Sequence, residues 1–405
     1  MNYTLRKNPN VIHKLSIFFV ILYLTILFSS AFIYIPVILI FLSLLIFKNF
    51  SSNLSVFISI IFVAIAASAK TLQGDLKNYE RYYLYVKDND LQTVLFSWLS
   101  ESSIRDTEIF FKFYNIIFAK LGINFEFFHI ITICLIYLSM LFFALNINDI
   151  LGSKAKKTFF DKHQDKIFVI LWTLLIGISF TLTSQVVKQY ISIALISIAI
   201  VLMLNNRKSF LPYIFIIISI FTHNATAIIL PLIFFAFLFK NIINNNFVKV
   251  LFVISAIASG FALTNLINIL GLSAIFSYGG MENANLGITV IFDFLILFLV
   301  FFVMPKNAQN KDLMFLRSLI FLFICFLLFS RDIPILLARV YFYMDIFRIF
   351  AGIYIYQTLQ KKDKSLFLTL LLFFGPIYWN LKLFSSDWDY SWFTSSDHMI
   401  QMFSN

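Results

Sequence analysis

The sequence has few charged residues for its length. Of its 405 residues, 13% are Asp, Glu, Lys or Arg, whereas 60% are hydrophobic. So little charge cannot cover the surface of a water-soluble domain, and so apolar a chain does not stay unfolded in water. The composition therefore excludes a water-soluble enzyme and a disordered protein.

Cysteine is also scarce. The two cysteines, Cys134 and Cys325, lie inside apolar runs, so they indicate neither a disulfide framework nor a metal site. No other pattern in the sequence requires a metal or a cofactor, and we expect none.

Long apolar runs dominate what is present, for example residues 35–47, 167–178 and 319–329, and Phe alone supplies 53 residues. These runs are apolar on every face, whereas a membrane β-barrel would alternate apolar and polar positions over segments of roughly 10 residues. The sequence predicts an all-α, polytopic integral membrane protein whose residues 1–405 form a single transmembrane domain. We expect about thirteen spans, with a range of about 11 to 14, starting near Leu15, Phe32, Leu54, Phe127, Ile167, Val186, Phe210, Ala225, Val248, Thr289, Leu313, Val340 and Ser365.

The basic residues set the orientation. A cytoplasmic N-terminus places most of the 31 Lys and Arg residues on the inner side of the membrane. Membrane topology and contact with lipid then account for most of the formal charge of +11, and no nucleic-acid partner is expected.

Residues 70–126 are the one long region that is neither a clean span nor a short connector, and they lie on the outer side. This segment contains no proline, and residues 107–120 have apolar positions at helical spacing around Glu108 and Lys112. Long connections in compact proteins are usually functional. We therefore expect amphipathic helices at the outer face that contribute to a site.

A short connection at Thr222-His223-Asn224 predicts a buried turn. From Lys208 to His223 a helix rises about 22 Å at ~1.5 Å per residue, less than the roughly 30 Å of hydrocarbon. A turn at that depth is tolerated only where protein or a water-filled cavity surrounds it. The hairpin therefore predicts an outward-open cavity, to which residues 70–126 contribute.

Two charged side chains are expected inside the membrane. Asp293 and Arg348 each lie about 20 Å from an inner lysine by the same rise, and charges at that depth need partners or water. Asp345 and Arg348 stand three residues apart on one predicted helix, so they are expected to neutralise each other.

Several motifs in order resemble the EpsG/Wzy-type polysaccharide polymerases. They are Gly74-Asp75 with Tyr79, then Glu108 opening an aromatic helix that runs to Leu121-Gly122-Ile123-Asn124, then Lys188-Gln189-Tyr190, Asn206-Arg207-Lys208, His223 and Ala338-Arg339-Val340-Tyr341-Phe342. The resemblance spans about residues 70–345. Where the family commonly has Arg followed by Gln, this chain has Lys188-Gln189, which keeps the charge but loses the planar fork of arginine.

The resemblance implies a glycosyltransferase that works without a metal on the outer face of the bacterial inner membrane. It would polymerise lipid-linked oligosaccharide repeats by moving the growing glycan from undecaprenyl diphosphate to a sugar hydroxyl of the next lipid-linked repeat. Such a reaction needs a base for the hydroxyl and cations for the diphosphate. The undecaprenyl diphosphate-linked oligosaccharide is the expected partner, and a chain-length regulator is a further candidate partner.

The candidate residues fall into three groups. The candidate bases are His223, Asp75 and Glu108; the diphosphate ligands are Arg339, Lys188 and Arg81; and the sugar ligands are Tyr79, Gln189, Tyr341 and Asp293. Each has an ordinary alternative: a capping histidine, solvated carboxylates, Lys and Arg side chains that reach lipid headgroups, interfacial aromatic residues, or a structurally paired Asp293.

Other functions stay open. A flippase or transporter of the same lipid-linked saccharide also needs a basic cavity, although no internal repeat is visible and the inner connections are short. An O-antigen ligase-like transferase would share the same residues. The sequence does not distinguish O-antigen, capsule and exopolysaccharide products.

Overall fold

The computed structural model describes residues 52–68, 74–100, 108–152, 159–179, 182–183, 186–205, 209–239, 245–269, 288–304, 311–331, 333–360 and 363–371. Every element of regular structure in these ranges is helical, and no strand occurs among them. The all-α prediction is therefore confirmed for the described residues.

Four of the described helices are long and apolar enough to cross a membrane, judged by length and composition. They are α8 (Phe125–Leu151), α11 (Val187–Asn205), α14 (Asn246–Ile269) and α17 (Lys311–Ser330). The chain is a multi-pass membrane protein. Shorter helices overlap other predicted spans: α4 (Ser52–Ser68), α9 (Phe159–Trp172) with the π-helical turn η1 (Thr173–Gly177), α12 (Leu211–Thr222), α13 (Leu230–Phe239), α16 (Ile288–Val303) and α19 (Met344–Thr358).

The total of about thirteen spans stays a prediction. The spans expected near Leu15 and Phe32 lie outside the described residues, and helix length alone does not fix how the shorter helices cross the bilayer. The span expected near Ser365 is helical over residues 363–371, where the described part ends.

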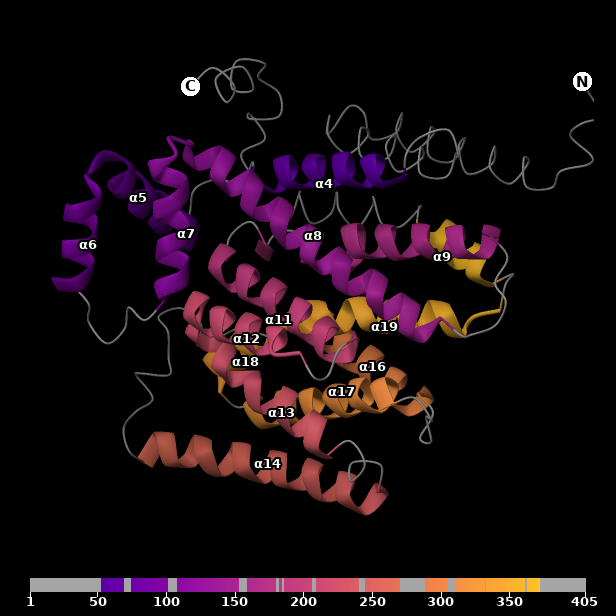
Figure 1. Cartoon of the computed structure of the whole chain (residues 1–405). Coiled ribbons are helices and arrows are strands. Elements are labelled where there is room, and N and C mark those ends of the chain that lie inside the picture. The colour runs from indigo at the N-terminus through magenta and orange to yellow at the C-terminus, as the bar shows by residue number, and fades with distance from the viewer. Residues whose placement is uncertain are drawn as a thin grey trace, which may run out of the picture.

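The segment predicted to lie at the outer face contains three short helices within its described residues, α5 (Gly74–Asp88), α6 (Leu91–Ser100) and α7 (Ile109–Lys120). They lie together at one end of the bundle (Figure 1). Apolar side chains of α5, α6 and α7 pack against Phe125 and Phe128 of α8 and Val187 of α11. These side chains form an apolar cluster that attaches α5, α6 and α7 to the ends of α8 and α11.

Local sequence explains the sharp turn from α7 into α8. Gly122 has a positive φ of 79°, a conformation that disfavours residues with a Cβ. Its N–H bonds the carbonyl of Ala119 at 3.1 Å and that of Ile123 bonds Phe118 at 3.3 Å, the pattern of a Schellman cap. The side chain of Asn124 then accepts from the N–H of Phe127 at 2.9 Å and caps α8.

The predicted turn at Thr222-His223-Asn224 is present. α12 ends at Thr222, His223 is extended, and the 3₁₀ turn η2 (Asn224–Ile228) leads into α13. Buried hydroxyls hold this hairpin, because Ser192 Oγ of α11 donates to the carbonyl of Ser219 at 2.7 Å and also contacts Thr226 Oγ1.

The stretch expected to begin a single helix near Val340 is broken. α18 (Pro334–Tyr341) ends in a tight turn at Phe342 and Tyr343, and α19 starts at Met344. The hydroxyls of the two flanking tyrosines bond different elements: Tyr341 bonds Asp293 of α16, and Tyr343 bonds Thr226 of η2.

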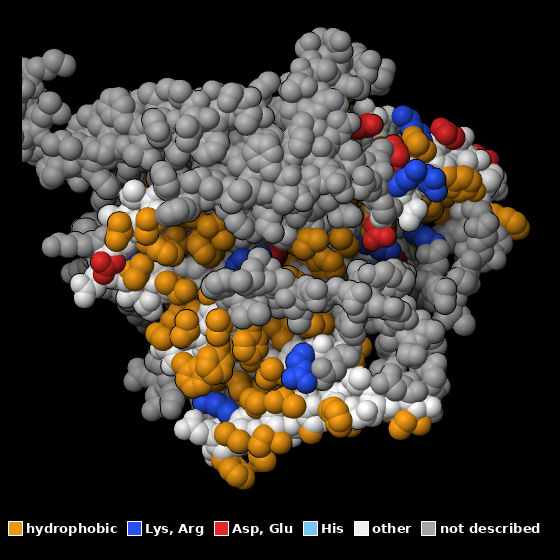
Figure 2. All heavy atoms as spheres, turned by 180° about the vertical axis from the view of Figure 1, so that it is seen from behind, with side chains coloured by type: hydrophobic (Ala, Val, Ile, Leu, Met, Phe, Trp, Pro, Cys, Tyr) orange, Lys and Arg blue, Asp and Glu red, His pale blue; other side chains and the backbone are white. Residues whose placement is uncertain are grey.

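Large apolar side chains remain exposed on α12, α13, α14 and α16. Figure 2 shows hydrophobic side chains over much of one described face, whereas acidic and basic side chains gather at the end where α5, α6 and α7 lie. An apolar face of this extent suits contact with lipid tails. The exposed apolar residues of these four helices include Ile214, Ile217, Phe221, Phe234, Phe235, Val250, Ile254, Phe261, Leu295, Leu299 and Phe302.

Candidate functional site

Three elements far apart in the sequence bring three of the predicted site residues together. Glu108 directly precedes α7, Lys188 lies in the first turn of α11, and His223 occupies the α12–η2 turn. Glu108 Oε2 lies 2.5 Å from Lys188 Nζ, and Glu108 Oε1 lies 2.6 Å from His223 Nδ1. We call Glu108, Lys188 and His223 the Glu108 cluster.

The cluster is partly shielded from water: the side chains of Glu108, Lys188 and His223 are 15%, 25% and 11% exposed. Burial opposes ionisation of Glu108, but the hydrogen bonds from His223 and Lys188 and the charge of Lys188 outweigh it. The pKa of Glu108 is therefore below its usual value. An ionised carboxylate only accepts hydrogen bonds, so His223 donates through Nδ1, and Nε2 of a neutral imidazole carries the lone pair.

Tyr79 of α5 lies beside the Glu108 cluster. The ammonium of Lys188 lies 5.7 Å from the centre of the Tyr79 ring, and the ring packs edge-on against Phe111 at 5.2 Å. Burial, with the negative charges of Asp75 and Glu108, raises the pKa of Tyr79, which stays a neutral phenol. Its buried hydroxyl has no hydrogen-bond partner within the described residues, which suits a ligand hydroxyl.

Arg339 approaches the cluster through its backbone. The carbonyl of Arg339 accepts a hydrogen bond of 3.1 Å from Nε2 of Gln189, the neighbour of Lys188. The side chain of Arg339 is half-buried, and its guanidinium makes no hydrogen bond or ion pair to the described part of the chain. A half-buried guanidinium in that state is suited to bind an anion.

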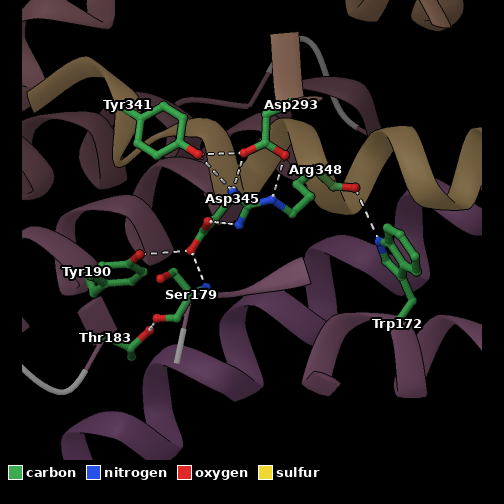
Figure 3. Close-up of polar contacts among 8 residues, drawn as sticks. All are labelled: Trp172, Ser179, Thr183, Tyr190, Asp293, Tyr341, Asp345 and Arg348. Carbon is green, nitrogen blue, oxygen red and sulfur yellow. Dashed lines mark hydrogen bonds and ion pairs between the residues drawn. The ribbon is translucent and has the colours of Figure 1, made fainter. Parts of the chain in front are cut away.

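Asp293 and Tyr341 meet each other in a different buried group. Tyr341 donates to Asp293 Oδ2 at 2.6 Å, and Arg348 binds both oxygens of Asp293, at 3.1 and 2.6 Å. Arg348 Nη1 also pairs with Asp345 at 2.6 Å, which confirms the expected neutralisation within one helix. These side chains point toward one another between α16, α18 and α19 (Figure 3).

Asp75 and Arg81 are exposed on α5, and neither side chain has a direct bond to the Glu108 cluster among the described residues. The charge of Asp75 contributes to the raised pKa of Tyr79, which lies beside the cluster. The charge of Arg81 acts on Glu80, where it opposes the rise of the pKa caused mainly by burial.

Two arrangements were not foreseen in the sequence. One is the link from the Asp345–Arg348 pair to Asp293 and Tyr341. The other is the hydroxyl cluster of Ser192, Ser219, Thr226 and Tyr343 beneath the hairpin. Small hydroxyl residues at inward positions of apolar helices were the available signal. Within the described residues, no three His, Cys, Asp or Glu side chains are grouped as a metal site would require.

Comparison with known proteins identifies one family. A model of the EpsG family matches residues 53–394, which is most of the chain and includes every candidate site residue named above. No curated protein and no solved structure matches the sequence.

Proposed function

The chain belongs to the EpsG family, which indicates a polysaccharide polymerase-type role, and we propose that it extends a lipid-linked glycan at the outer face of the bacterial inner membrane. In the proposed reaction, C1 of the growing glycan leaves the oxygen of undecaprenyl diphosphate and bonds a sugar hydroxyl of the next lipid-linked repeat. The hydroxyl proton passes to a base on the protein, and undecaprenyl diphosphate departs as an anion. The reaction therefore needs one base and several cations.

The bridging position of Glu108 between His223 and Lys188 carries this proposal. An imidazole whose Nδ1 donates to a carboxylate has its Nε2 available as a general base, and the carboxylate stabilises the imidazolium that forms. Because both oxygens of Glu108 are engaged and its pKa is lowered, Glu108 is the weaker base. We assign the proton transfer to His223 and the orientation of its ring to Glu108.

Arg339 is the proposed main ligand of the diphosphate. Its guanidinium can bind phosphate oxygens through two parallel hydrogen bonds. Lys188 is already paired with Glu108, so it contributes a nearby point charge rather than a full countercharge. Arg81, exposed on α5, stays a further candidate for the outer part of the diphosphate or glycan.

Tyr79 is the proposed sugar contact. Its ring lies beside Lys188 of the Glu108 cluster and can pack against a sugar, and its buried hydroxyl has no hydrogen-bond partner among the described residues. Asp75, exposed one turn earlier on α5, is close enough to reach a second sugar hydroxyl. In this proposal α5, α6 and α7 cover an outward-open cavity, and the glycan leaves past them.

A direct test uses purified protein in liposomes with a lipid diphosphate-linked repeat, followed by glycan length on a gel. The proposal predicts a ladder of products from wild type, loss of the ladder in Arg339→Ala, and partial retention in Arg339→Lys. Arg331→Ala serves as the control, because Arg331 is an exposed arginine to which the proposal assigns no role. If the substrate crossed the bilayer without growing, the result would exclude a polymerase and indicate a transporter. A single transfer to a lipid core would indicate a ligase.

A further inference from the structure

The buried charges between α16 and α19 take no part in the chemistry proposed above. Asp345 is 2% exposed, and the side chains of Asp293 and Arg348 are 11% and 16% exposed. Isolated charges at such depth are costly, so a chain retains them where they are fully paired and serve a purpose.

Every carboxylate oxygen in this group accepts a hydrogen bond. Asp345 Oδ1 receives Arg348, and its Oδ2 receives the N–H of Ser179 at 2.7 Å and the hydroxyl of Tyr190 at 2.8 Å (Figure 3). Both oxygens of Asp293 are occupied by Arg348, with Tyr341 as a further donor. A substrate would have to displace these donors to reach either carboxylate.

The contacts close into a circuit that passes through Arg339. From Gln189 the path runs to the carbonyl of Arg339, along α18 to Tyr341, and across to Asp293. From there it continues through Arg348 and Asp345 to Tyr190, which follows Gln189 in the sequence. The circuit fixes the backbone of Arg339 relative to the first turn of α11, which carries Lys188.

Among the charged side chains of this circuit, Asp293, Arg348 and Asp345 are paired, whereas the guanidinium of Arg339 makes no hydrogen bond or ion pair to the described residues. Groups that stabilise developing charge are most effective when they are held in place before the reaction begins. The circuit meets this condition, because it fixes the backbone of Arg339 while the guanidinium has no bond to the described residues.

We infer that Asp293, Arg348, Asp345 and Tyr341 are positioning residues that hold Arg339 for the departing diphosphate. This inference rests on the proposed function. Asp293, Tyr341 and Gln189 then serve the site as a frame rather than as sugar ligands.

The test removes one hydroxyl of the frame. Tyr341→Phe keeps the ring but loses the bond to Asp293, and we expect kcat to fall about 10- to 100-fold, as displaced catalytic groups do. KM should change by less than about threefold, because the displacement of Arg339 acts mainly on the additional negative charge that the leaving diphosphate gains in the transition state. Tyr356→Phe is the matched control on α19, because its ring is stacked on Phe168 at 3.8 Å and it lies about 12 Å beyond Arg348 by helical rise.

Combination with Arg339→Ala separates positioning from general weakening. If Tyr341 acts through Arg339, adding Tyr341→Phe to Arg339→Ala lowers the residual rate by less than about twofold. An equal fall in both backgrounds would overturn the inference. Gln189→Leu opens the circuit at its other end and must show the same dependence on Arg339, so a poorly folding Tyr341→Phe does not leave the question open.

A second readout needs no substrate. Amide exchange of residues 334–341 should accelerate at least about tenfold in Tyr341→Phe and stay unchanged in Tyr356→Phe. Unchanged protection of α18 in Tyr341→Phe would overturn the frame. A wild-type protein that makes no polymer would instead refute the proposed function, while the exchange result would still decide whether the circuit holds α18.

Discussion

Replacement of Glu108 by Gln tests the Glu108 cluster most sharply. The amide keeps the shape of the side chain but removes the charge that faces His223 at 2.6 Å and Lys188 at 2.5 Å. A hydrogen bond to a charged group contributes about 1.5–3 kcal/mol, and removal of a partner from a well-buried ion pair costs about 3–5 kcal/mol. Since the three side chains are 11–25% exposed, we expect about 2–3 kcal/mol at the imidazolium.

That loss corresponds to a fall in kcat of about 30- to 150-fold, because about 1.4 kcal/mol is tenfold in rate. The assay measures initial rates of glycan extension in liposomes for wild type and for Glu108→Gln. Glu126→Gln, which changes an exposed carboxylate in the first turn of α8, should alter the rate by less than about twofold. Equal rates for Glu108→Gln and Glu126→Gln would refute the assigned role of the cluster.

Three further predictions follow from the same contacts. Because the folded-state pKa of Glu108 is lowered, its pairing stabilises the fold fully above the usual value of 4.5 and is lost as the pH falls through the folded-state pKa. The difference in unfolding free energy between wild type and Glu108→Gln should therefore shrink as the buffer is made more acidic than about pH 4.5. Lys188→Arg should keep the polymerisation rate within about threefold of wild type, whereas Lys188→Gln should lower it at least about tenfold. Equal polymerisation rates for Lys188→Arg and Lys188→Gln would exclude a role for the charge. In thermal unfolding in detergent, Gly352→Ala should cost about 3 kcal/mol, because its Cβ would lie 2.0 Å from the indole of Trp172, whereas Gly122→Ala, with open space but a positive φ, should cost about 1 kcal/mol.

Hydrophobicity and turn chemistry predicted much of the fold. Apolar runs located the long helices, and the motif from Glu108 to Asn124 indicated the helix that is observed as α7. The hairpin at His223 followed from the short helical rise between Lys208 and His223, which is less than the thickness of the hydrocarbon. These features depend on neighbours in the sequence, so a single chain reveals them.

Contacts between distant helices could not be predicted in the same way. Glu108 and His223 are 115 residues apart, and Asp293 and Arg348 are 55 apart, so their pairing depends on helix rotation and packing. The expectation that buried charges need partners correctly indicated that Arg348 is paired, but only the fold shows that Asp293 is one of those partners. Similarly, the break at Phe342 and Tyr343 has no proline or glycine to mark it, and it arises where two tyrosine hydroxyls bond different elements.

The most direct test of the central claim measures, in one experiment, the glycosidic bonds formed and the undecaprenyl diphosphate released. Wild-type protein in liposomes receives a lipid diphosphate-linked repeat, and released undecaprenyl diphosphate is measured together with glycan length. The proposed function predicts one undecaprenyl diphosphate released for each new glycosidic bond, with both signals lost in His223→Gln. Transfer of intact lipid-linked repeats across the bilayer, with no diphosphate lipid released and no longer glycan formed, would contradict it.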